Sequence, residues 1–114
     1  MKESAYQTIV MDYIKSVGGW CFTTHGGSQF QRAGLPDVIA CYKGFFFGLE
    51  LKVGNYQATE LQKSTLNNIQ DTGGVGLVLR DNLTHIKDVI RYIDKYNKIP
   101  KLSHYPVDGG IVFD

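Results

Sequence analysis

Cysteine, long apolar runs and an excess of either charge are all scarce in this sequence. The two cysteines, Cys21 and Cys41, form neither a zinc-binding spacing nor a disulfide framework, so we expect buried free thiols. No apolar run approaches the roughly 18 residues that span a bilayer, and the N-terminus lacks the apolar core of a signal peptide. These absences predict a soluble intracellular protein with no membrane partner.

The charge balance gives no general attraction to nucleic acid. The sequence has 12 Lys and Arg against 11 Asp and Glu, which gives a formal net charge of +1. A protein that binds DNA with so little net charge needs a local basic patch, offset by acidic residues elsewhere.

The chain does contain enough apolar residues for one core. Its 114 residues are 43% hydrophobic, which favours a single folded domain over disorder and leaves no room for a second domain. We expect one domain over residues 1–114, with its core at about 3–96 and a C-terminal tail at 97–114. Within the tail, residues 111–113 could add a short strand or a partner contact.

Apolar periodicity predicts an α/β fold, a mixed β-sheet flanked by helices. The expected helices are residues 2–17, 59–71 and a last one that starts with residues 81–84, and the expected strands are 20–24, 37–42, 45–53 and 75–80. The stripes expected to face the core are Tyr6, Ile9, Val10, Tyr13, Ile14 and Val17, then Leu61, Leu66 and Ile69, then Ile86, Val89, Ile90 and Ile93. Outside the last stripe lie Lys87, Arg91, Lys95 and Lys98, either as a solvated face or as a DNA-facing flank.

A β-hairpin is predicted at the centre of the chain. Two apolar runs, residues 37–42 and 45–53, are separated only by Lys43-Gly44, and a two-residue link containing glycine favours a tight turn. Lys-Gly is not among the preferred pairs for such a turn. The predicted register pairs Tyr42 with Phe45.

In this register Asp37 falls opposite Glu50. Directly opposed Cβ atoms lie roughly 4.5–5.5 Å apart, so two carboxylates meet on one face, with Lys52 one pleat away on the same face. Opposed like charges destabilise a sheet unless a cation lies between them, and a divalent metal with hard oxygen ligands is the first candidate. The alternative is an ordinary surface ion pair between Glu50 and Lys52. Glu50 and Lys52 are the only charged residues in 45–53. A charge on an otherwise apolar strand costs free energy unless it is paired with an opposite charge or has a role in a functional site.

The same residues resemble a known signature. Gly34-Leu35-Pro36-Asp37, followed after 12 intervening residues by Glu50-Leu51-Lys52, is similar to the PD-(D/E)xK nuclease motif. Neighbouring residues, namely Arg32-Ala33, Val53-Gly54, Thr59–Lys63 and Thr72–Val75, narrow the resemblance to the virus-type replication–repair nuclease (VRR-NUC) domain in its small, stand-alone, phage-like form. The resemblance covers about residues 3 to 80. It implies a restriction-endonuclease-like core and a cytoplasmic location, in a bacterium or in a phage-infected bacterial host.

The resemblance also implies a catalytic site for Mg²⁺ or Mn²⁺. The implied residues are Asp37, Glu50 and the Leu51 backbone carbonyl as ligands, Glu3 as a further ligand, and Lys52 and Gln62 in catalysis. Two of these residues also have a structural explanation. Glu3 lies in the first turn of a helix, where the helix dipole favours a carboxylate, and Gln62 matches a capping box with Thr59. Both interpretations stay open for each residue.

A loop that could bind DNA precedes the hairpin. Residues 25–34 hold three glycines and show neither a helical nor a strand period. Arg32 can bind two phosphate oxygens through its guanidinium group, and Ser28, Gln29 and Gln31 can donate hydrogen bonds to the backbone of DNA. The alternative is that all four are solvated loop residues. His25 is a further candidate, as a phosphate contact, a proton carrier or an ordinary loop histidine. We also expect Lys63 to contact DNA.

The resemblance implies metal-dependent hydrolysis of DNA phosphodiester bonds. Stand-alone members resemble Holliday-junction resolvases, so the leading expectation is a homodimer that makes two matched nicks in a four-way junction. Two alternatives stay open: a less selective nuclease acting on flaps or single strands, and a non-enzymatic DNA-binding module that keeps the nuclease fold.

Overall fold

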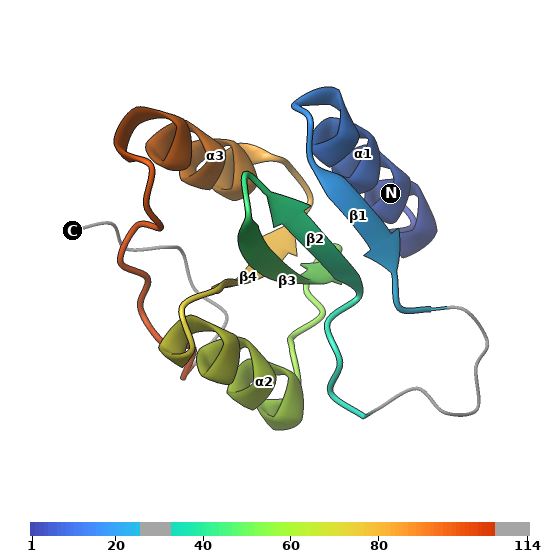
Figure 1. The fold of residues 1–114 in the computed structure, drawn as a ribbon. Coiled ribbons are helices and arrows are strands. Elements are labelled where there is room, and N and C mark those ends of the chain that lie inside the picture. The colour runs from blue at the N-terminus through green and yellow to red at the C-terminus, as the bar shows by residue number, and fades with distance from the viewer. Residues whose placement is uncertain (26–32, 107–114) are drawn as a thin grey trace.

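The protein folds into a mixed β-sheet with helices on both faces (Figure 1). The structure, a computed structural model, describes residues 1–25 and 33–106. In chain order its elements are α1 (Glu3–Ser16), β1 (Trp20–Thr23), β2 (Val38–Tyr42), β3 (Phe45–Lys52), α2 (Glu60–Asp71), β4 (Val75–Arg80) and α3 (Thr84–Tyr96). The predicted α/β class is confirmed, and the arrangement is compatible with a restriction-endonuclease-like core.

The strands lie in the order β1-β2-β3-β4, antiparallel except for the parallel pair β3–β4. Tyr42 pairs with Phe45, so the predicted hairpin register is confirmed. Both turn residues have positive φ, 49° at Lys43 and 84° at Gly44, as in a type I′ turn. Asp94 of α3 accepts hydrogen bonds from the Lys43 ammonium at 2.6 Å and the Tyr42 hydroxyl at 2.5 Å, which ties this turn to the helix.

The main core lies on the face of the sheet that α1 and α3 cover, whereas α2 covers the other face (Figure 1). Side chains alternate along each strand, so every second residue enters this core. Its buried members include Tyr6, Val10 and Ile14 of α1, Val38, Leu49, Leu51, Leu77 and Leu79 of the sheet, and Ile86, Val89, Ile90 and Ile93 of α3. The apolar stripe predicted for the last helix is therefore confirmed.

Two glycines let α2 approach β3 and β4 closely. A Cβ on Gly76 would lie 2.3 Å from the Leu66 carbonyl oxygen, and one on Gly48 would lie 2.5 Å from Ile69 Cδ1. The first contact is with helix backbone, which cannot move aside, so this packing requires glycine. Glu50 follows Gly48 by two residues on the same face, and it is buried on the side that α2 covers.

The sequence predicts burial of Cys41, Ile9 and Leu61, and these three predictions are wrong. The helices cover less of the sheet, and bury less of their own apolar side, than the sequence pattern suggests. Cys41 is exposed on the α2 side of the sheet, where Trp20, Phe22 and Phe46 are exposed too. In α1 the buried residues are spaced four apart, which leaves Ile9 to one side and 45% exposed. In α2 only Leu66 of the predicted stripe is fully buried, and Leu61 is 52% exposed. Cys21 is a buried free thiol, as expected.

The segment after α3 covers the edge of β4. The hydroxyl of the buried Tyr105 accepts a hydrogen bond from the Val78 N–H at 3.2 Å, and the Tyr105 N–H donates to the Asn67 side chain at 2.8 Å. Such a contact blunts the exposed edge of a terminal strand. The predicted tail therefore packs on the domain at least to Tyr105, while residues 111–113 lie outside the described residues. Within the described ranges, no helix is long and apolar enough to cross a membrane.

Candidate metal and catalytic site

The hairpin brings Asp37 and Glu50 together. The β2–β3 ladder ends with Val38 paired to Leu49, and the next residues outward are Asp37 and Glu50. The backbone N–H of Leu51 donates to Asp37 Oδ2 at 2.8 Å, which fixes one oxygen of this carboxylate against the neighbouring strand. Both carboxylates are buried: Asp37 is 4% exposed and Glu50 is 1% exposed.

The Glu50 carboxyl lacks sufficient positive charge around it. Its pKa is raised to about 9, first because the group is buried and then because Asp37 lies beside it, and Lys52 lowers the pKa only in part. Glu50 Oε2 is buried and has no hydrogen-bond partner among the described residues. A buried, unpartnered carboxylate oxygen is costly, so this position is one that a cation would stabilise.

Lys52 lies on the same face as Glu50, as strand alternation predicts. Its ammonium is 3.6 Å from Glu50 Oε1, and its side chain is 14% exposed. The distance is long for a hydrogen bond, so the pair interacts chiefly through charge. Lys52 therefore places a positive group beside the two carboxylates while its side chain still reaches the surface.

Glu3 and His25 reach Asp37 from other elements. One ligand atom each from Glu3, His25 and Asp37 lies within 4.8 Å of the others. His25 Nε2 contacts Asp37 Oδ1, the oxygen that Leu51 does not hold. The structure thus places His25 at the carboxylates themselves. No pattern in the sequence gave this position, because it depends on the pairing of β1 with β2.

These groups fit a divalent cation. Asp37 and Glu50 offer oxygen donors, Glu50 Oε2 is unpartnered, and Glu3 approaches Asp37 from α1. In an antiparallel arrangement the N–H and C=O of one residue leave the strand on the same side. Since the Leu51 N–H points at Asp37, the Leu51 carbonyl faces the same side and can act as the predicted further ligand. Oxygen donors of this kind suit Mg²⁺ and Mn²⁺.

Gln62 lies in the capping box at the start of α2. Its Oε1 accepts a hydrogen bond from the Thr59 N–H at 2.8 Å, and Thr59 Oγ1 accepts from the Gln62 N–H at 3.2 Å. The capping role predicted for this residue is confirmed. The structure does not join its amide oxygen to the carboxylates, so a catalytic role stays a prediction.

Lys63 occupies a position poorly suited to DNA contact. Its side chain is 10% exposed, and its ammonium lies 3.3 Å from Glu60 Oε1 and 3.5 Å from the Pro106 carbonyl oxygen. These contacts hold the ammonium between α2 and the segment after α3. The other predicted DNA contacts, Ser28, Gln29, Gln31 and Arg32, lie outside the described residues.

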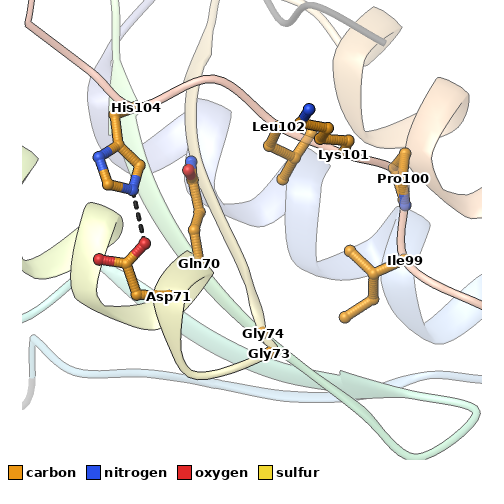
Figure 2. Close-up of a pocket in the computed structure, with 9 residues that line it drawn as sticks. All are labelled: Gln70, Asp71, Gly73, Gly74, Ile99, Pro100, Lys101, Leu102 and His104. Carbon is orange, nitrogen blue, oxygen red and sulfur yellow. Dashed lines mark hydrogen bonds and ion pairs between the residues drawn. The ribbon is translucent and has the colours of Figure 1, made fainter. Parts of the chain in front are cut away.

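A separate pocket lies at the other end of α2 (Figure 2). Its volume is about 280 Å³, and its lining residues are Gln70, Asp71, Gly73, Gly74, Ile99, Pro100, Lys101, Leu102 and His104. His104 Nε2 and Asp71 Oδ1 contact each other at one end of it, at a distance of 2.7 Å. None of the carboxylate-site residues lines it, so we place the candidate chemistry at Asp37 and Glu50.

No protein-family model, curated protein or solved structure matches the chain. The resemblance to the VRR-NUC domain therefore rests on the motif residues themselves.

Proposed function

We propose that the protein is a metal-dependent, structure-selective DNA endonuclease. Its leading substrate is a four-way junction, and it acts as a homodimer in the cytoplasm. The single observation that carries this proposal is the buried pair of carboxylates, Asp37 and Glu50, with Lys52 beside them and one carboxylate oxygen unpartnered. A structural ion pair alone would not require the second carboxylate.

Each group has a distinct task in phosphodiester hydrolysis. A bound Mg²⁺ or Mn²⁺ supplies an activated water and polarises a phosphoryl oxygen. Asp37, Glu50 and the Leu51 carbonyl would hold that ion, and the Leu51 N–H keeps Asp37 oriented. Lys52 stabilises the negative charge that develops on the phosphate, and its partial burial limits screening by water.

The choice of a four-way junction comes from the family resemblance and from symmetry. A four-way junction has approximate two-fold symmetry, and its resolution needs two matched cuts. A homodimer with two-fold symmetry presents two identical sites, and such dimers are the commonest protein oligomers. Recognition would depend on DNA shape and backbone, because phosphate contacts carry no sequence information.

A cleavage assay on purified protein tests the proposal. Labelled four-way junction, flap and plain duplex are incubated with Mg²⁺ or Mn²⁺, using wild type, Asp37→Asn, Glu50→Gln and Lys52→Ala. We expect each substitution to lower the rate about 10²–10³-fold or more while junction binding persists. Lys15→Ala, at the exposed end of α1, is the matched control for the loss of a lysine.

The assay separates the competing functions. Junction cleavage well above flap and duplex cleavage supports a resolvase, and flap cleavage equal to or above junction cleavage supports a less selective nuclease. On a cruciform plasmid a dimer should give linear product without a build-up of nicked circles. Metal-dependent DNA binding with no cleavage would favour the binding module. Full activity in all three site variants would overturn the site assignment.

A further inference from the structure

His25 is held next to the carboxylates by the end of the β1–β2 ladder. The Thr24 N–H donates to the Asp37 carbonyl at 2.9 Å, and Thr24 Oγ1 donates to the Pro36 carbonyl at 2.6 Å. These bonds extend the ladder by one residue beyond Thr23–Val38. His25 is the next residue, so its ring is placed against Asp37 by backbone pairing, although its side chain remains 49% exposed.

The donor atoms of Glu3, His25 and Asp37 are spaced as ligands of one ion. All three lie within 4.8 Å of one another. A small divalent ion binds its ligands at about 2.0–2.1 Å, so opposite ligands lie about 4.2 Å apart. Glu3 and His25 are exposed and can make the small adjustment required. Asp37 is fixed by Leu51, and its Oδ1 already points to this side.

A second observation also points to a cation at this place. Asp37 belongs to the buried pair with Glu50, whose Oε2 is buried and has no hydrogen-bond partner among the residues described. Lys52 lies 3.6 Å from the other oxygen, Glu50 Oε1, so Oε2 itself has no hydrogen-bond partner within the described ranges. Any ion bound by Asp37 Oδ1 would meet the imidazole nitrogen.

We propose that His25 supplies a nitrogen ligand to the cation, shared with Asp37 and Glu3, and that this ligand biases the site toward Mn²⁺ over Mg²⁺. Mg²⁺ prefers oxygen ligands and retains its waters, whereas transition-metal ions accept imidazole more readily. The inference rests on the cation site of the proposed function, but its test needs neither DNA nor cleavage.

Pulsed electron paramagnetic resonance on the Mn²⁺-loaded protein tests the ligand directly. A histidine nitrogen bonded to Mn²⁺ modulates the electron spin echo. We expect this nitrogen signal in wild type and its loss in His25→Gln, whose amide can still hydrogen-bond to Asp37. His104→Gln is the matched control, because His104 also contacts an aspartate, Asp71, and its substitution should leave the signal intact.

Calorimetric titration supplies the second readout. His25→Gln should weaken Mn²⁺ binding about tenfold or more and weaken Mg²⁺ binding far less. A wild-type echo without nitrogen modulation, or modulation that persists in His25→Gln, would overturn the inference. Cleavage of DNA without a nitrogen signal would leave the nuclease proposal standing and refute the His25 ligand. A nitrogen signal without cleavage would support the His25 ligand and refute the nuclease proposal.

Discussion

At the scale of single residues, Glu50 has unfavourable surroundings in the absence of a cation. It is 1% exposed, has Asp37 as a neighbour and keeps one oxygen unpartnered within the described part of the chain. An apolar or amide residue at this position would cost less free energy. A buried carboxyl group with such neighbours is therefore expected at a functional site. The stability of the metal-free protein should therefore improve when this ionisable group is replaced by a neutral amide.

With a chelator present at pH 8, Glu50→Gln should raise the melting temperature by several degrees. This corresponds to a gain of at least about 1 kcal/mol in the free energy of unfolding. The folded-state pKa of Glu50, about 9, lies above the usual value for an unfolded chain. The folded wild type therefore loses stability as the pH rises from about 5 toward 9, and the glutamine variant does not. Scanning calorimetry at pH 5, 7 and 8 measures this difference.

Glu50→Gln should also reduce the stabilisation that a bound metal ion gives to the folded protein. Mn²⁺ should raise the melting temperature of wild type, because it binds only the folded state, and should raise that of Glu50→Gln much less. Asp12→Asn, at an exposed position on α1, is the control for a neutralised carboxylate. A variant less stable than wild type at pH 8 in chelator would contradict the argument.

At the scale of elements, the start of α2 decides between two roles of Gln62. The capping box satisfies two N–H groups, those of Thr59 and Gln62. If capping is the only role, Thr59→Ala and Gln62→Ala should each lose about 0.5–2 kcal/mol of stability and keep similar cleavage rates. Denaturant unfolding and the junction assay measure both effects. A loss of rate in Gln62→Ala that Thr59→Ala does not share would instead support a catalytic role.

Local patterns in the sequence predict these elements well. The hairpin register follows from a two-residue turn and side-chain alternation, and it also predicts that Asp37, Glu50 and Lys52 share a face. Capping and glycine positions predict the ends of α2. These features depend on neighbours in the sequence, so a single chain contains the information needed.

Features that depend on contacts between distant segments could not be predicted in this way. Cys41 of β2 is exposed because α2 packs closely against β3 and β4, at Gly48 and Gly76, and leaves this part of β2 uncovered. Lys63 is buried because a segment more than 40 residues later lies over it. His25 reaches Asp37 because β1 pairs with β2 across a long connection. Neither the apolar periodicity nor the motif spacing encodes these placements.

At the scale of the whole molecule, electrostatics should make DNA binding depend on the cation. A net charge of +1 provides almost no long-range attraction for a phosphate backbone. The candidate site brings Glu3 near Asp37, which also lies beside Glu50 on the neighbouring strand, and Lys52 is the lysine next to Glu50. Without a metal ion, this part of the surface should repel a phosphate, and an ion that neutralises the carboxylates should reverse that effect.

Wild type should therefore bind a four-way junction about tenfold more tightly with Ca²⁺ than with chelator, a difference of about 1.4 kcal/mol. Ca²⁺ takes the same oxygen ligands, and a denaturing gel verifies that the junction stays intact. Fluorescence anisotropy at several salt concentrations gives the affinities. Asp37→Asn should bind more tightly than wild type in chelator, since it removes one repelling charge, whereas Asp12→Asn should not. Equal wild-type affinity in Ca²⁺ and in chelator would mean that the phosphates bind away from the carboxylates.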